Sequence, residues 1–441
     1  MPDRVSKQRF KLSADVFIMI TMVIDGMGAG VAAPILPQLI VELTGNSVAE
    51  GALYGGALIA SFATMQIVFA PVLGNLSDRF GRRPVLLGSL GTFGINYLLM
   101  GFASDIAFLF VGECIAGAFG ATMSTAGAYM ADVSDAKDRT RRFGAITAAY
   151  GVGITVGPML GGLVAPYGSR TPFFCSAGLA LLNVAYGYFV LPESLAVDQR
   201  RPFSIRRANP VGALAQIRYE PRAIELLGAY ALMQMAMLAV PATWAYFTML
   251  KFGWAPREIG ISMSVYAVLT ILIQGILLGH VHRWIGSERT AYLGFVCTII
   301  ASIGYAFATQ SWMMLAFIMP AVLGSLAGPT LISYLSNHIP ANSQGELQGA
   351  VATVTGATTV CAPLLMTHLL SYFSSADALV YFPGAPYVGA ALFATLGLLV
   401  AIRPFRSRSG RGGEEASGNN RYHSANPKPV HQLRHNSDDG Q

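Results

Sequence analysis

The chain of 441 residues is 53% hydrophobic and only 12% charged, whereas about 25% of the residues of a soluble domain are charged. So little charge cannot cover the surface of a soluble protein of this length, and the composition therefore predicts a membrane protein. The net charge of +6 would suit a nucleic-acid partner, but the distribution of the basic residues along the chain accounts for it without one.

Apolar segments that reach the length needed to cross a bilayer, about 20 residues, recur along the chain. The first is preceded by basic residues like a secretion signal, but it is too long and lacks a cleavage site, so we expect it to remain as a helix. The four cysteines lie inside apolar segments, without the spacing of a metal site or a disulfide. The sequence predicts an all-α membrane protein with twelve transmembrane helices, at residues 14–40, 51–74, 84–103, 106–129, 142–165, 172–191, 222–250, 257–281, 289–308, 312–336, 344–370 and 385–403.

The loops between the predicted helices alternate between basic and neutral. All Lys and Arg residues except Arg170, Lys251 and Arg257 lie at the N-terminus, in every second loop or in the C-terminal tail. Basic loops stay on the cytoplasmic side of a membrane, so both termini are predicted to be cytoplasmic.

Two polar hairpins divide the chain into halves. Gly74–Pro84, GNLSDRFGRRP, and Gly279–Arg289, GHVHRWIGSER, each hold two glycines at the same spacing, with arginines around them. Glycine permits the tight turn that each hairpin needs. The repeat predicts two pseudo-symmetric six-helix bundles at 1–191 and 222–403, with a cytoplasmic linker at 192–221 and a disordered cytoplasmic tail at 404–441.

The first hairpin is interpreted as a conformational latch between the halves rather than as a substrate site. The sequence SQGE, Ser343–Glu346, predicts a capping box at the start of the eleventh helix. Asp78 is the expected partner of the positive N-terminus of that helix, in a contact that would lock the cytoplasmic side. The latch residues are Gly74, Asp78, Arg79, Gly81, Arg82, Arg83, Asp132 and Glu346.

The fifth predicted helix contains GVGITVGPMLGG, in which Gly153, Gly157 and Gly161 recur every fourth residue beside Pro158 and Gly162. Small residues at this spacing let another backbone approach closely. Proline frees a carbonyl or kinks the helix. The motif is compatible both with static packing and with a sliding seal between the halves.

Two carboxylates lie inside predicted helices, Asp25 near mid-depth and Glu113 nearer the outer side. Such a group costs roughly 2.5–3.5 kcal/mol on insertion scales, so it is a candidate functional group. The chain holds no phosphate-binding loop, nucleophile elbow or HExxH motif, so we expect a transporter driven by an ion gradient and not an enzyme. Asp25 and Glu113 are candidates for proton coupling, with a static polar cluster as the alternative.

Uncharged polar residues at depth, among them Asn183, Gln274 and Thr298, either join helices or line a cavity. The pair His280 and His282 lacks further ligands and does not predict a metal site. The candidate substrate-binding residues are Asp25, Gln66, Asn96, Gln234, Trp244 and Tyr246.

Several motifs resemble the major facilitator superfamily and, within it, the bacterial tetracycline efflux proteins. GNLSDRFGRRP is similar to the superfamily's signature loop, and GVGITVGPMLGG to its antiporter motif. The closer similarity lies in IDGMGAGVAAPILPQL, MQIVFAPVLGNLSDRFGRRPVLL, ADVSDAKDRTRRFG, VPATWAYF and QGELQG, and it extends to about residue 405. It implies an inner-membrane exporter that exchanges a drug carried with a divalent cation such as Mg²⁺ for a proton, without a tightly bound cofactor.

The resemblance assigns functional positions to Asp25, to Gln66, to the latch residues of the first hairpin and to Asp132. The chain departs from the family at four positions: the family's aspartate is Asn96 here, its arginine is Glu113, its histidine falls near Thr270 and a further aspartate falls near Thr298. Since these positions are linked to coupling and drug passage in the family, we expect a different coupling route in which Glu113 carries a proton.

The sequence therefore predicts proton-coupled efflux of a tetracycline-like drug by alternating access, from a monomer or weak oligomer in the lipid bilayer. Three alternatives remain open at this point: an exporter of other amphipathic drugs or metabolites, a proton symporter that imports its substrate, and a membrane receptor or scaffold without turnover.

Overall fold

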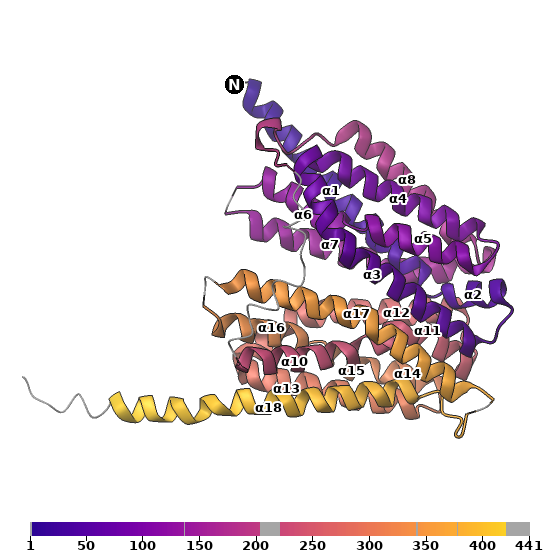
Figure 1. Cartoon of the computed structure of the whole chain (residues 1–441), viewed down its shortest axis with the longest axis vertical. Coiled ribbons are helices and arrows are strands. Elements are labelled where there is room, and N and C mark those ends of the chain that lie inside the picture. Colours follow the sequence, from indigo (N-terminus) through magenta and orange to yellow (C-terminus); the bar gives the residue numbers. More distant parts are fainter. Residues whose placement is uncertain (1, 136, 203–220, 341–342, 377, 420–441) are drawn as a thin grey trace, which may run out of the picture.

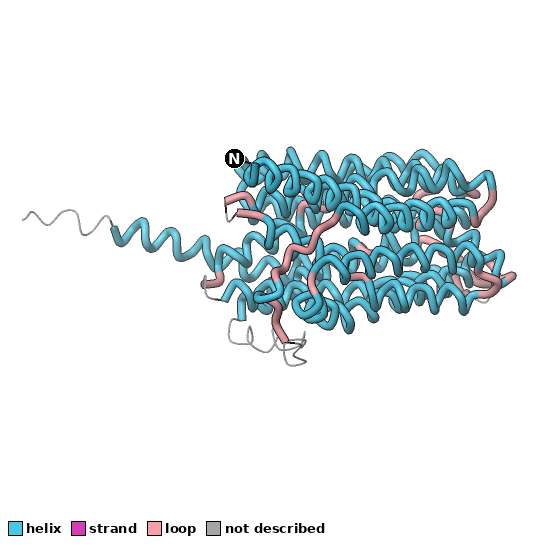
Figure 2. The backbone as a smooth tube through the Cα atoms, turned by 90° about the horizontal axis from the view of Figure 1, so that it is seen from above, coloured by secondary structure: helices cyan, strands magenta, loops and turns pink. Residues whose placement is uncertain are grey.

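The computed structural model describes residues 2–135, 137–202, 221–340, 343–376 and 378–419, which form helices and loops without a strand. Figure 1 shows two helical bundles side by side, and Figure 2 shows the connecting loops gathered mainly at the two ends of the helices. The N-terminal bundle consists of α1 (Pro2–Ala32), α2 (Leu36–Thr44), α3 (Val48–Phe80), α4 (Arg82–Phe102), α5 (Ile106–Phe119), α6 (Thr122–Val133), α7 (Arg139–Val164), η1 (Ala165–Tyr167) and α8 (Thr171–Val190), followed by η2 (Val197–Gln199). The C-terminal bundle consists of α10 (Pro221–Met237), α11 (Ala239–Phe252), α12 (Pro256–Leu272), the π-helical turn η5 (Ile273–Leu277), α13 (Leu278–Phe307), α14 (Ser311–Ala316), α15 (Ile318–Gly324), α16 (Ala327–His338), α17 (Gln344–Ser374) and α18 (Ala385–Asn419).

The all-α membrane fold predicted from the sequence is confirmed. Eleven stretches of the described chain are long and apolar enough to cross a membrane, and the longest, Pro256–Phe307, has 52 residues. A straight helix of that length would measure about 78 Å, more than twice the thickness of a bilayer core. Gly286 interrupts it with a non-helical backbone, φ 80° and ψ 167°. Divided there, the stretch supplies two crossings, and the total becomes twelve.

The two hairpins adopt the same turn, which supports the repeat read from the sequence. Gly81 has φ 108° and ψ 161°, close to the values of Gly286. A side chain with a Cβ rarely adopts such a positive φ, so glycine is required at both positions. Gly74 and Gly279, their partners in the repeat, both border open space.

Several predicted spans are broken within continuous apolar segments. The first divides at residues 33–35, where Pro34 cannot donate a helical hydrogen bond. The fourth divides at Gly120, whose carbonyl accepts a hydrogen bond of 3.0 Å from the Gln66 amide. The seventh divides at Leu238, one turn before Pro241. Each break leaves backbone groups that only a neighbouring helix, a side chain or water can satisfy.

The ends of the predicted domains differ in part from the structure. The tail was expected from residue 404, but α18 continues as a helix to Asn419. Residues 203–220 of the linker and 420–441 of the tail lie outside the described residues.

The bundles touch mainly at one end, which we call the far end. The other end, here called the basic end, carries the hairpin Gly74–Pro84 and the arginines that begin α7. Across the bundles, α3 packs against α17 and α11, and α7 packs against α12. One hydrophobic core joins both bundles there, whereas two further cores each belong to a single bundle. Figure 1 shows the bundles closest together beside α2 and α11.

Candidate functional site

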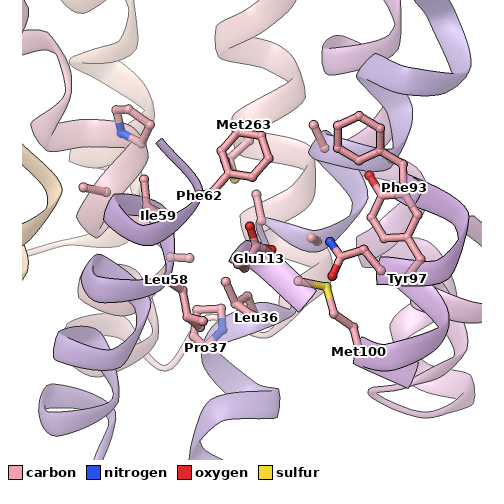
Figure 3. A pocket seen from close by; sticks show the side chains of 18 of the residues that line it. Leu36, Pro37, Leu58, Ile59, Phe62, Phe93, Tyr97, Met100, Glu113 and Met263 are labelled. Atoms are coloured by element: carbon pink, nitrogen blue, oxygen red, sulfur yellow. The ribbon is translucent and has the colours of Figure 1, made fainter. Parts of the chain in front are cut away.

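A cavity of about 310 Å³ lies between the two bundles. Most of its lining is aliphatic or aromatic, and the polar exceptions are Asn96, Tyr97, Glu113 and Tyr246. Figure 3 shows Glu113 near the middle of the lining, between Leu36 and Tyr97. The remaining lining residues are Gly28, Ala29, Ala32, Ala33, Leu36, Pro37, Leu58, Ile59, Phe62, Phe93, Met100, Pro241, Ala242, Ala245 and Met263.

Glu113 and Asn96 form the polar side of this cavity. The Asn96 side chain on α4 lies next to the Glu113 carboxylate, where α4 packs against α5. Asn96 is only 3% exposed, and its Oδ1 has no hydrogen-bond partner. A buried amide oxygen without a partner is unfavourable unless a ligand or water satisfies it.

Tyr97 lies within electrostatic range of both membrane carboxylates, Asp25 on α1 and Glu113 on α5. Its ring approaches the backbone of Gly28, where even a Cβ would collide with the phenol oxygen. Asp25 itself does not line the cavity. It lies also within electrostatic range of Tyr150 on α7. Tyr97 therefore lies near both acids. The glycines that follow Asp25 were the available sequence signal, since Gly28 makes room for the Tyr97 ring.

A second cavity of about 350 Å³ adjoins the first, and Pro241 and Met263 line both. It lies among α7, α11 and α12, with Trp244 and Tyr266 in its wall. The Trp244 indole donates a hydrogen bond of 2.9 Å to the Ser262 hydroxyl, which fixes the ring. Thr270, the position where the family's histidine falls, lines this second cavity.

The predicted substrate-binding residues are thus only partly gathered at the cavities. Asn96 and Tyr246 line the first cavity and Trp244 the second. Gln66 and Gln234 line neither, and Gln66 instead satisfies the carbonyl at the break between α5 and α6. The sequence left open whether a polar residue joins helices or lines a cavity. Gln66 joins two helices here.

The glycine motif of the fifth span faces two neighbours. A Cβ on Gly153, Gly157 or Gly161 would collide with the backbone of α1, so these three pack α7 onto a helix of the same bundle. Gly162 instead faces the backbone of Pro256 and Arg257 in the C-terminal bundle. The two interpretations of the motif therefore apply to different residues: one face packs within a bundle, and the other forms a seal between bundles.

We call the contact of α7 with α12 the seam. The Pro158 carbonyl lies so close to Gly260 of α12 that a side chain there would collide with it. The Met159 N–H donates a hydrogen bond of 3.1 Å to the Ser264 hydroxyl. Within the described part of the chain, this is the single hydrogen bond that connects the two bundles.

At the basic end, the predicted latch residues pair within the N-terminal bundle. Arg82 binds Asp78 at 2.6 Å and Asp132 at 3.1 Å. The Arg83 guanidinium donates to the Tyr188 carbonyl and lies over the Tyr188 ring. No described hydrogen bond or ion pair connects Asp78 with α17, so the proposed contact with the eleventh span is not made in this conformation.

The start of α17 also differs from the predicted capping box. The Ser343 side chain makes no capping hydrogen bond. The Gln344 amide instead donates to the carbonyls of Ser336 and Ile339 at 2.7 and 3.1 Å, and so ties α17 to the end of α16. Glu346 lies in the first turn of α17, where an acidic residue suits the helix dipole.

Glu193 is a residue whose role the sequence analysis missed, because it treated 192–221 only as a linker. Its carboxylate accepts hydrogen bonds from the backbone N–H groups of Arg82 and Arg83, at 2.8 and 3.3 Å. It therefore caps α4 from a distant part of the chain. The linker contacts the hairpin again beyond Glu193, because the Arg201 N–H donates a hydrogen bond to the Asp78 carbonyl.

Comparison with known proteins agrees with this architecture. The model of the Major Facilitator Superfamily matches residues 18–358. The chain is 35% identical to the class C tetracycline resistance protein of Escherichia coli, over 86% of this chain and 94% of that protein. It is 34% identical to the class H tetracycline resistance protein of Pasteurella multocida, with the same coverage. A crystal structure of the nucleoside transporter NupG shares the fold, with a TM-score of 0.70 and 12% identity over 90% of this chain and 98% of that one.

The match to the superfamily covers most of the chain, and the similarity to the resistance proteins extends over nearly the whole length of each. Both hairpins, the small-residue seam and the cavity between the bundles lie within or beside the matched region. The chain is therefore a multi-pass membrane protein that belongs to the major facilitator superfamily, in the family of the bacterial tetracycline resistance proteins.

Proposed function

We propose that this protein exports a tetracycline-like drug from the cytoplasm in exchange for protons, by alternating access across the inner membrane. The relatives named as tetracycline resistance proteins support the class of substrate. In the proposed orientation the basic end, with both termini, faces the cytoplasm, because basic loops are retained there. The seam then closes the outer side, and the drug enters from the cytoplasm with the Mg²⁺ that it binds.

The observation that carries the proposal is the presence of two membrane carboxylates within electrostatic range of Tyr97, one of them on the cavity wall. A carboxylate removed from water favours its protonated form, so a change in access to water can change its protonation. Glu113 would bind and release a proton in the cavity that holds the drug. Asp25 would bind and release a proton outside the cavity. Asn96, where the family has an aspartate, leaves Glu113 as the acid of the lining.

Inverted membrane vesicles test this function. With an imposed pH gradient, vesicles that contain the wild-type protein should accumulate tetracycline, and collapse of the gradient should release it. Asp25→Asn should abolish the gradient-driven accumulation, and Glu113→Gln should reduce it. Accumulation no greater than in vesicles without the protein would refute the drug assignment, and normal accumulation by both variants would refute the coupling route.

The latch prediction belongs to the other half of the cycle. When the basic end closes, Asp78 would move from Arg82 toward the N-terminus of α17. Asp78→Ala should therefore slow transport more than it weakens drug binding. Equal loss of transport rate and of affinity would assign Asp78 to binding instead.

A second candidate function, export of other amphipathic compounds, is favoured by the cavity itself. Its wall is aromatic and aliphatic around one carboxylate, without a basic side chain among its lining residues. Such a wall suits a range of hydrophobic ligands.

A further inference from the structure

The cavity contains an acid without a cation. Glu113 is the one carboxylate among the lining residues, and that lining includes no Lys, Arg or His. Within the described residues, none of the ion pairs involves Glu113. An ionised carboxylate in such a site is unfavourable unless something positive arrives to pair with it.

The neighbouring amide also lacks a partner. Asn96 lies next to Glu113, and its buried Oδ1, which faces the backbone of Gly112, makes no hydrogen bond. The ionised carboxylate and the amide oxygen are acceptors, and the NH2 group of Asn96 is the single source of donors in this pair. A ligand that brings positive charge complements this pair, and an anion would be repelled by it.

The rest of the wall suits the hydrophobic part of such a ligand. Phe62, Phe93, Tyr97 and Tyr246 supply aromatic rings. Rings of this kind attract a desolvated cation through their faces. Met100 and Met263 add flexible thioethers that adapt to ligands of different shape.

We infer that Glu113, supported by Asn96, is the specificity-determining group of a site for hydrophobic organic monocations. The inference deepens the proposed export function and rests on it for the identity of the cavity as a substrate site. It names a second class of cargo beside a drug carried with a metal ion: a molecule whose own positive centre pairs with Glu113 while its apolar body occupies the aromatic wall.

Asp25 does not share this role. It does not line the cavity, and it lies within electrostatic range of Tyr97 and Tyr150. The two acids are therefore separable by experiment: Glu113 should decide which ligands bind, and Asp25 should affect coupling without changing that selection.

Binding of two probes of similar shape tests the inference. The full chain in lipid nanodiscs, without a pH gradient, is titrated with tetraphenylphosphonium and with neutral triphenylphosphine oxide. Wild-type protein should bind the cation at least about tenfold more tightly than the neutral compound, because the charge pair is desolvated in the cavity. This comparison requires no variant and so cannot fail through misfolding.

Variants then locate the preference. Glu113→Gln should bind both probes with nearly equal affinity, Glu113→Asp should keep part of the preference, and Asp25→Asn should keep all of it. Equal binding of both probes by the wild type, no binding of the cation, or an unchanged preference in Glu113→Gln would each overturn the inference. Loss of gradient-driven drug export with the preference intact would instead overturn the proposed function and leave the cation site in place.

Discussion

The seam at the far end and the network at the basic end are built from opposite chemistry. The seam joins two bundles through glycines, backbone carbonyls and one hydrogen bond. The network holds the hairpin Gly74–Pro84 with ion pairs and a carboxylate cap, and all its described partners belong to the N-terminal bundle or the first residues of the linker. The difference teaches that strong polar contacts are confined to one bundle, whereas the contact between the bundles, which opens in the proposed cycle, depends mainly on close backbone packing.

The most damaging change we expect is Gly260→Leu at the seam. A Cβ there meets the Pro158 carbonyl, which is backbone and cannot turn aside. Overpacking of this kind costs about 1–3 kcal/mol, all of it in the closed seam. Spin labels at Tyr167 and Gln310, in a variant without the native cysteines, should report a longer distance between the bundles, and drug export should fall. Gly178→Leu is the control, since its Cβ would enter open space; an equal effect of both changes would refute the seam.

A smaller effect is expected at the cap of α4. Glu193→Ala removes the acceptor for the N–H groups of Arg82 and Arg83. Loss of a capping acceptor costs about 0.5–2 kcal/mol, so the thermal unfolding temperature should fall while the seam distance stays unchanged. Asp198→Ala removes an acid from the same linker, at an exposed position, and should leave unfolding unaltered. If the seam distance changed in Glu193→Ala, the two regions would not be independent.

The mildest change is Ser264→Ala, which removes the hydrogen bond from the Met159 N–H. A single hydrogen bond contributes about 0.5–1.5 kcal/mol, so the open form should gain population without loss of folding. Ser264→Thr should restore the wild-type distribution of seam distances. Ser61→Ala serves as the control, because the Ser61 hydroxyl donates to the Leu58 carbonyl within its own helix. If Ser264→Ala and this control gave the same seam distances, the hydrogen bond would not stabilise the seam.

The sequence predicted those features that composition and spacing determine. Hydropathy gave the helical membrane fold, and the matched glycines anticipated the turns at Gly81 and Gly286. Hydropathy did not predict the breaks at residues 33–35 and at Gly120, because the apolar composition stays the same where a helix is interrupted. They depend on a proline and on a partner amide from another helix.

The site was predictable in its acids but not in its arrangement. Asp25 and Glu113 stand out because they are acids within apolar helices, yet nothing in the sequence places Tyr97 near both of them. Glu193 was hidden for the same reason: its partners lie in a hairpin more than a hundred residues earlier. Contacts between distant segments follow from helix packing, which one sequence does not reveal.

The single hydrogen bond of the seam has a consequence for the work done in one transport cycle. In the proposed cycle the seam parts toward the outer water, so exposure of the core that joins the bundles adds an apolar cost to that of the polar contacts. One hydrogen bond amounts to about 0.5–1.5 kcal/mol. One elementary charge that crosses a potential of 100 mV releases about 2.3 kcal/mol. In the proposed cycle, the polar contact of this seam therefore costs less than the work of a single charge, whereas ion pairs like those of Arg82 would add further polar contacts to break.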